Sequence, residues 1–318
     1  MTAKRAFIFG VDTYDRFSSL TGCVNDAMAL EPLLASNEDG APNFSVIART
    51  SDKNRITRAT MLSDLDRLLV GGADVALLFF AGHGHVEHDE LHLVTQDGTQ
   101  QEPGVPFSKL LKLIQESKVP EVMVLLDCCF SGGAGGVPIL GSDTIVLRRG
   151  VSILTASRAD QVSEEVGGQG MFSYYLIAAL EGGAADVLGA VTVAGLYCYL
   201  SESFGPFDQR PMFRGHLDRL HCVRQCNPIV PMADLRRIVQ FFPRADFLLQ
   251  LDPSYEPTAE PSNTTNEAIF SILQRYRANK LLEPVGAAHM FFAAIERKHC
   301  KLTPLGKHYW NLVKRSLI

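Results

Sequence analysis

Two adjacent cysteines and one distant histidine stand where nucleophilic chemistry could occur. A run of apolar residues is followed by an acid, Asp127, and then by Cys128 and Cys129, and His83 lies between Gly82 and Gly84 after another such run. A thiol becomes a nucleophile when a base removes its proton, and backbone N–H groups beside glycine can stabilise the oxyanion that then forms. Taken singly, a cysteine at a strand end is usually a small core residue, so the prediction depends on its pairing with the histidine.

These residues need a scaffold that brings them together, and the sequence predicts one. Strands and helices alternate through the first two hundred residues, and most of the strands are continuous apolar runs. This pattern is typical of an α/β fold, a mostly parallel sheet flanked by helices, which binds ligands beyond the carboxyl ends of its strands. Both motifs lie at such ends. The predicted strands are 5–11, 44–50, 74–82, 92–94, 121–127, 150–157 and 210–215, and the predicted helices are 25–36, 57–70, 107–117, 171–180 and 192–204.

The composition predicts a cytoplasmic protein. The chain has 318 residues, of which 46% are hydrophobic and 20% charged, as in ordinary globular proteins. Its N-terminal segment has too short an apolar run for a secretion signal, and its longest apolar stretch is too short to cross a bilayer. Seven cysteines, an odd number without a regular framework, fit free thiols in a reducing compartment. We therefore expect no membrane partner.

A change in charge marks a predicted domain boundary. Residues 1–227 carry 18 Lys and Arg against 27 Asp and Glu, a net charge of −9. Residues 228–318 carry 12 against 8, a net charge of +4. An asparagine and two prolines in 226–231 interrupt any regular element at the change of sign. We predict one domain over 1–227 and a second over 228–318.

The cysteine and histidine motifs resemble those of metacaspases and related caspase-like cysteine peptidases. The segments "FFAGHGH" and "LLDCCFSGG" carry the resemblance, and "LTGCVNDAMAL" adds to it. Three separated motifs in the correct order are specific, and the likeness covers roughly residues 5–220. It implies a caspase-like sheet flanked by helices, with His83 as the base and Cys129 as the nucleophile. It also implies that the N–H groups of Gly84 and Cys129 bind the oxyanion, and that Cys128 is only a neighbour.

The resemblance further implies cleavage of protein substrates after Arg or Lys. A pocket for a cationic side chain needs a carboxylate, because an unpaired buried charge is costly. Asp127 precedes the nucleophile by two residues, and Asp26 lies in the segment that lines this pocket in metacaspases, with Cys23 as a third wall. Alternatively, Asn25 or Asp26 caps a helix and Asp127 only orients its loop. The serine that metacaspases have two residues before the histidine is Ala81 here.

A metal site is the alternative interpretation of the histidine segment. His83, His85 and His88 have a spacing close to that of metallo-hydrolase ligands. The chain has no histidine between His92 and His216 to complete such a site, and a metal leaves the cysteine motif unexplained. We therefore predict no metal and no cofactor. Calcium dependence stays open, because no residues match the acidic calcium site of many metacaspases.

The glycine-rich segment 132–149 ends in two arginines, Arg148 and Arg149, just before a predicted strand. Such segments are favoured sites of nicking, so cleavage by the enzyme itself is one expectation. An uncut loop that covers the substrate is the other, because the arginines lie so close to the strand.

The C-terminal region is predicted to be a small, mainly helical domain. Residues 266–284 have helical spacing, and a final helix begins at Thr303 and Pro304. The segment "LTPLGK" resembles the end of many winged-helix domains, which bind DNA or proteins. The modest basicity of residues 228–318 favours a regulatory protein partner over nucleic acid.

Together these features predict a cysteine endopeptidase regulated through its C-terminal domain. The alternatives are a catalytically silent caspase-like adaptor and a DNA-binding or partner-binding regulator that acts through residues 228–318. An adaptor needs neither His83 nor Cys129, so the presence of both favours the enzyme.

Overall fold

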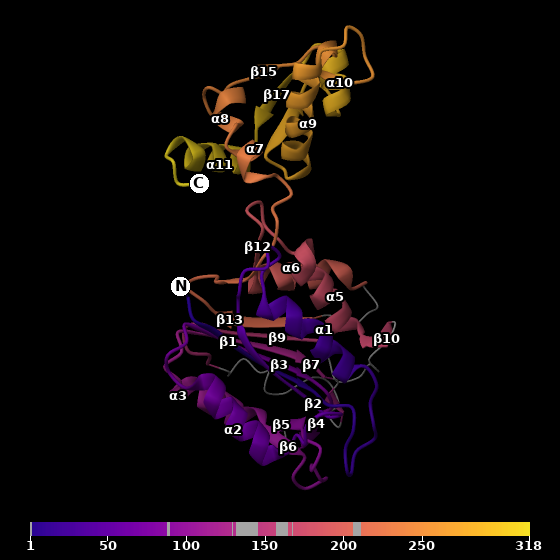
Figure 1. The fold of residues 1–318 in the computed structure, drawn as a ribbon, viewed down its shortest axis with the longest axis vertical. Helices are drawn as coiled ribbons and strands as arrows, with labels where there is room; N and C mark the ends of the chain where they lie inside the picture. Colours follow the sequence, from indigo (N-terminus) through magenta and orange to yellow (C-terminus); the bar gives the residue numbers. More distant parts are fainter. Residues whose placement is uncertain are drawn as a thin grey trace. The chain divides into compact units, whose positions relative to one another are not determined.

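A computed structural model of the chain describes residues 2–87, 90–128, 130–131, 146–156, 165–166, 168–205 and 211–318 (Figure 1). For residues 130, 131, 165 and 166 the backbone alone is described. Contacts divide the chain into two units, Met1–Asp186 with Ala190–Cys226 and Val187–Gly189 with Asn227–Ile318. No helix among the described residues is long and apolar enough to cross a membrane.

The first unit is built on a six-stranded sheet. Its strands are β1 (Lys4–Gly10), β2 (Ser45–Thr50), β3 (Val75–Ala81), β7 (Glu121–Asp127), β9 (Val151–Thr155) and β13 (Met212–His216). They pair in the order β13-β9-β7-β3-β1-β2. All neighbours are parallel except β13, which runs antiparallel to β9 at one edge. The predicted α/β class with a mostly parallel sheet is confirmed.

Helices cover both faces of this sheet, which is why its central strands are apolar throughout. Helices α2 (Arg58–Leu69) and α3 (Phe107–Glu116) pack on one face, and α1 (Cys23–Ala35), α5 (Met171–Ala178) and α6 (Val193–Ser203) pack on the other (Figure 1). Alternate residues of one strand enter different cores: Leu78 and Phe80 face α2 and α3, whereas Leu77 and Phe79 face the opposite helices.

Short strands complete the first unit. A four-stranded sheet in the order β6-β5-β4-β8 joins the chain that follows His83 to the chain that follows Cys129. Of these strands the sequence predicted only 92–94, because segments of two to five residues show little periodicity. The bounds are β4 (Gly84–Glu87), β5 (Glu90–Val94), β6 (Gly104–Pro106) and β8 (Phe130–Ser131), then β10 (Glu165–Val166) paired with β11 (Gln169–Gly170), a π-helical turn (Ala179–Gly183), and β12 (Ala190–Thr192) paired with β14 (Cys222–Gln225).

The first helix is capped from a distance, and the predicted local cap is wrong. Helix α1 starts at Cys23, so Asn25 and Asp26 lie inside its first turn. The cap comes from Asp12, whose carboxylate accepts the N–H groups of Cys23 at 2.9 Å and Val24 at 3.3 Å. A cap from eleven residues upstream has none of the local spacing by which helix starts are recognised.

The second unit combines short helices with a three-stranded antiparallel sheet in the order β15-β17-β16. Its core includes the buried rings of Phe242, Phe270 and Tyr276. The elements are α7 (Met232–Leu235), α8 (Ile238–Phe241), β15 (Leu249–Gln250), a 3-10 turn (Pro253–Tyr255), α9 (Thr264–Ala278), β16 (Leu282–Val285), α10 (Met290–Ile295), β17 (His299–Leu302) and α11 (Pro304–Lys314).

Two predictions for this unit have different outcomes. The final helix begins as predicted, with the Thr303 hydroxyl accepting the N–H of Gly306 at 3.1 Å. The helix predicted over 266–284 ends at Ala278 instead, because Leu282–Val285 pairs with β17 as a strand. Helix α10 joins β16 to β17, where a wing would have a simple hairpin, so the winged-helix assignment stays a prediction.

Candidate active site

The chain segments that contain the two motifs run side by side. Ala81 at the end of β3 pairs with Asp127 at the end of β7 in a parallel register. Beyond these strands, Gly84 of β4 pairs with Phe130 of β8, again in parallel. The turn that contains His83 is therefore flanked on both sides by paired backbone at the carboxyl edge of the sheet, where ligands bind such folds.

The imidazole of His83 is oriented by the loop between β1 and α1. Its Nε2 lies 2.8 Å from the carbonyl oxygen of Ser18. A carbonyl only accepts, so in the neutral ring Nε2 carries the hydrogen and Nδ1 keeps its lone pair. The rings of Tyr14 and Phe17 lie 4.9 Å and 6.2 Å from it between centroids. Burial lowers the pKa of His83 below its ordinary 6.5; the hydrogen bond to Ser18 opposes this and His85 adds to it.

Tyr14 holds the backbone of the same turn. Its hydroxyl accepts the N–H of His83 at 2.9 Å and donates to the carbonyl of Val11 at 2.8 Å. Burial raises the pKa of Tyr14 well above its ordinary value, so the hydroxyl keeps the proton that it donates. A Cβ at position 82 would lie 2.8 Å from this hydroxyl oxygen, so glycine lets the hydroxyl approach the turn closely. The N–H of Gly82 in turn donates to the carbonyl of Asp127 at 3.2 Å.

Two predicted substrate-binding acids converge on Gly170. Asp26 is 2% exposed, and its Oδ2 accepts the N–H of Gly170 at 3.3 Å. The Oδ2 of Asp127 accepts the hydroxyl of Ser173 at 2.5 Å and its N–H at 3.2 Å. A Cβ on residue 170 would lie 2.7 Å from Asp127 Oδ2 and 3.4 Å from Asp26 Oδ2, so glycine lets both carboxylates approach one point. This arrangement suits a cationic group.

Burial shapes the protonation of these groups. It raises the pKa of Asp127, and the hydrogen bonds from Ser173 oppose that rise. A cation brought beside the carboxylate would lower the pKa again. Burial also raises the pKa of Cys23 far above its ordinary value, with added contributions from Asp12, Asp127 and Asp26. Burial thus favours the neutral thiol of Cys23 beside these acids.

The structure describes only the first of the two cysteines in the motif. Cys128 is 3% exposed and belongs to the hydrophobic core under α2 and α3, which confirms its interpretation as a core residue. Cys129 lies outside the described residues, as does the segment 132–145. Gly84 lies at the start of β4. The assignment of oxyanion binding to the N–H groups of Gly84 and Cys129 stays a prediction.

The metal hypothesis gains no support from the histidines that the structure describes. Within the described ranges, no three His, Cys, Asp or Glu side chains are grouped so as to hold a metal ion. The ring of Phe17 lies 5.8 Å from that of His85 and 6.2 Å from that of His83 between centroids. His88 lies outside the described residues.

Sequence reasoning missed several residues of this site. Asp12, Tyr14 and Ser18 belong to the loop that leaves the carboxyl end of β1, and Gly170 and Ser173 lie at the start of α5. One signal was present for the first group: a polar segment directly after a buried strand of a parallel sheet reaches the ligand-binding edge. The second group lies in "GQGMFSYYLIAALEGGA", a segment that also resembles metacaspases, but the resemblance implied no role for these two residues.

Comparison with known proteins identifies the family to which the first unit belongs. A family model described as the caspase domain matches residues 3–219. Caspase-1 from Spodoptera frugiperda has a similar solved structure, with a TM-score of 0.50 and 17% sequence identity over 71% of this chain and 91% of that chain. A structural genomics target from Geobacter sulfurreducens has a TM-score of 0.53 and 16% identity over 70% of this chain and 97% of that chain. At these identities the two structures show the fold alone. No curated protein matches the sequence. Because the family model spans more than half of the sequence, the chain belongs to the caspase domain family of cysteine peptidases.

Proposed function

We propose that the protein is a cysteine endopeptidase that cleaves protein substrates after Arg or Lys, with Cys129 as nucleophile and His83 as base. Register is the observation that carries the proposal. Both parallel pairs that flank the site join residues 46 positions apart, and His83 and Cys129 have the same separation. Paired strands are about 4.8 Å apart, a spacing that supports proton transfer between side chains of matched positions.

The hydrogen bond to Ser18 gives the histidine a defined task. With Nε2–H donated to that carbonyl, Nδ1 takes the proton of the Cys129 thiol. The thiolate attacks the scissile carbonyl carbon, and backbone N–H groups of Gly84 and Cys129 stabilise the oxyanion. Collapse of the resulting tetrahedral intermediate breaks the C–N bond while His83 returns the proton to the leaving amine. The acyl group then remains on Cys129 as a thioester. Water, deprotonated by the same ring, then hydrolyses the thioester.

The convergence of Asp26 and Asp127 supports specificity for a basic side chain. The guanidinium or ammonium group of the substrate would place a positive charge beside these two buried carboxylates, with Cys23 as a neutral wall. The site thus binds the residue whose carbonyl Cys129 attacks. A metacaspase type of caspase-like peptidase has this preference.

A panel of fluorogenic peptides tests the proposal. Wild type should cleave Arg and Lys peptides and leave an Asp peptide uncut. Asp26→Asn should lower kcat/KM for the Arg peptide by about 30-fold or more, the effect of losing about 2 kcal/mol from a buried charge pair. Asp66→Asn, at an exposed position of α2, is the matched control and should cleave normally. Preference for the Asp peptide, or normal Arg cleavage by Asp26→Asn, contradicts the assigned specificity.

We also assign residues 228–318 a regulatory role as a separate domain that binds a protein partner. One side of α10 supports this, since Phe291, Phe292 and Ile295 are 40%, 43% and 37% exposed at helical spacing. Binding of duplex DNA is the alternative. Fluorescence anisotropy with labelled duplex at several salt concentrations decides between them, because phosphate binding weakens steeply with salt. Tight, salt-steep binding would favour the nucleic acid.

A further inference from the structure

A polar cavity of the first unit lies where the strands of the sheet begin, at the edge opposite to the candidate active site. Its volume is about 770 Å³. Asp74 and Gly150 line it at the positions just before β3 and β9, and Glu121 is the first residue of β7 between them. The chain between β13 and β14 forms another part of the wall. The proposed peptidase reaction uses none of these residues.

Glu121 is the unusual feature of this cavity. Its side chain is 4% exposed, and its Oε2 is paired with Nδ1 of His221. Its Oε1 is buried and has no hydrogen-bond partner among the described residues. Lys4 interacts with Glu121 electrostatically, but the hydrogen bonds of its Nζ go to the side chain of Asn43 and to the carbonyl of Cys222, both at 2.7 Å. A buried carboxylate oxygen without a donor is costly, so the site is short of one N–H group.

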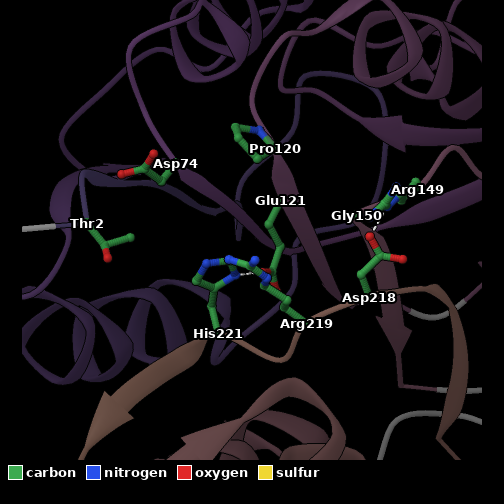
Figure 2. A pocket seen from close by; sticks show the side chains of 9 residues that line it. All are labelled: Thr2, Asp74, Pro120, Glu121, Arg149, Gly150, Asp218, Arg219 and His221. Carbon is green, nitrogen blue, oxygen red and sulfur yellow. Dashed lines mark hydrogen bonds and ion pairs between the residues drawn. The ribbon is translucent and has the colours of Figure 1, made fainter.

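The cavity is lined by further charged side chains, which lie on either side of Glu121 (Figure 2). Figure 2 shows Glu121 and His221 between Asp74 on one side and the ion pair of Arg149 with Asp218 on the other. Glu121, which is paired with His221, and Asp74, whose Oδ2 accepts the N–H of Ala3 at 2.7 Å, thus lie on the same side of that ion pair (Figure 2). Their strands are neighbours, so the two carboxylates start from backbones about 4.8 Å apart.

Arg219 supplies a charge of the opposite sign. It is exposed, lines the cavity, and forms no ion pair with any residue in the described ranges. A cationic group therefore finds acceptors at Glu121 and Asp74, and an anionic group finds a donor at Arg219. A metal ion does not fit, since the described acids and histidines form no cluster of three ligands.

We propose that this cavity binds a small basic zwitterion. A guanidinium or ammonium group pairs with the carboxylates of Glu121 and Asp74, and a carboxylate accepts from the guanidinium of Arg219. Two sources have this chemistry: free arginine, and the basic C-terminal residue of a peptide. The site is separate from the pocket assigned to Asp26 and lies at the other end of the sheet.

Isothermal titration of the full chain tests the proposal with ligands that differ by one group. L-Arginine carries both charges, agmatine lacks the carboxylate, and L-citrulline lacks the cation. Arginine should bind, and each of the other two should bind about tenfold more weakly, since each loses one charged hydrogen bond. N-Acetyl-L-arginine identifies the source: binding equal to that of arginine indicates a peptide end, and weaker binding indicates the free amino acid.

Variants locate the binding. Arg219→Ala should weaken arginine about tenfold and leave agmatine unchanged, whereas Glu121→Gln should weaken both about tenfold. Arg219 is exposed, so its loss leaves the fold intact even if Glu121→Gln is unstable. Arg236→Ala, an exposed arginine of α7's C-terminal flank, is the matched control and should bind as wild type.

Binding in the peptidase pocket is a separate outcome. Asp26→Asn should leave arginine binding unchanged if the cavity is the site. Arginine binding that disappears in Asp26→Asn and persists in both cavity variants overturns this proposal and supports the peptidase pocket. Absence of arginine binding at millimolar concentration overturns the cavity site alone, and absence of peptide hydrolysis with intact cavity binding overturns the peptidase alone.

Discussion

Gly84 and Phe130 are parallel partners across two short strands that lie beyond the ends of β3 and β7. The alignment of the two long strands thus continues past the turns that follow them. One turn contains His83, and the other segment contains Cys129. The effectiveness of a base and a nucleophile depends on such fixed alignment, because misplacement of about 1 Å can cost on the order of a hundredfold in rate.

Tyr14 is expected to act as a positioning residue for His83. Tyr14→Phe removes the hydroxyl that joins the N–H of His83 to the carbonyl of Val11. We expect kcat to fall about tenfold with KM nearly unchanged, because the ring is displaced from the nucleophile while substrate contacts remain. Steady-state kinetics on an Arg peptide measures the split. Tyr174→Phe, at an exposed tyrosine, is the control, and an unchanged kcat in Tyr14→Phe contradicts the role.

Asp127→Asn is expected to raise the melting temperature of the protein and to lower its cleavage of Arg peptides. Burial raises the folded-state pKa of Asp127 above 3.8, so its stabilising contribution is present below that pH and is lost as pH rises through the folded pKa. The amide oxygen can still accept from Ser173. The variant should therefore melt about 2–4 °C higher at neutral pH, the shift for about 1 kcal/mol in a domain of this size.

Thermal melts at several pH values check this expectation, with the gain shrinking toward acid. Cleavage of the Arg peptide should fall in the same variant, because the basic side chain loses a carboxylate. A lower melting temperature at neutral pH with undiminished Arg cleavage identifies Asp127 as a purely structural acid.

The pH dependence of cleavage should follow the lowered pKa of His83. Burial disfavours the imidazolium, so the acid limb of kcat/KM should have its midpoint below 6.5. His85→Gln removes a neighbouring like charge and should move this midpoint upward. Initial rates with an Arg peptide between about pH 4 and 8 measure both midpoints. A midpoint at or above 6.5 in wild type is the contrary result.

Self-cleavage after Arg148 is not expected. Its guanidinium donates to the carbonyls of Ile114 and Val119, each at 2.7 Å, and to that of Arg149 at 2.9 Å. A side chain fixed in this way cannot enter a specificity pocket unless these bonds break. Intact-mass analysis of active protein should show an uncut segment 132–149. A fragment ending at Arg148 would contradict this expectation and show that these hydrogen bonds break readily.

The sequence predicted the parts of this molecule that depend on local pattern. The apolar runs 75–81 and 121–127 gave the central strands, and the motifs after them were placed correctly at one edge of the sheet. The same runs made the parallel class recognisable, since strands covered on both faces have no polar alternation.

The remainder depends on contacts between distant segments. Asp12 caps a helix that begins eleven residues later, and Ser18 and Tyr14 reach His83 across more than sixty residues. Gly170 was not predicted because its role, close approach to two carboxylates, is visible only when α1 and β7 are placed together. The helix predicted over 266–284 was likewise too long, because its helical pattern continues past Ala278 whereas Leu282–Val285 pairs with β17 as a strand.

The central claim is that Cys129, and not its neighbour, is the nucleophile activated by His83. Hydrolysis of a fluorogenic Arg peptide by single variants tests it most directly. We predict that Cys129→Ala and His83→Ala each lower kcat/KM by about a thousandfold or more, while Cys128→Ala, which truncates a buried core residue, keeps most of the activity. Retained cleavage by Cys129→Ala together with lost cleavage by correctly folded Cys128→Ala would contradict the account.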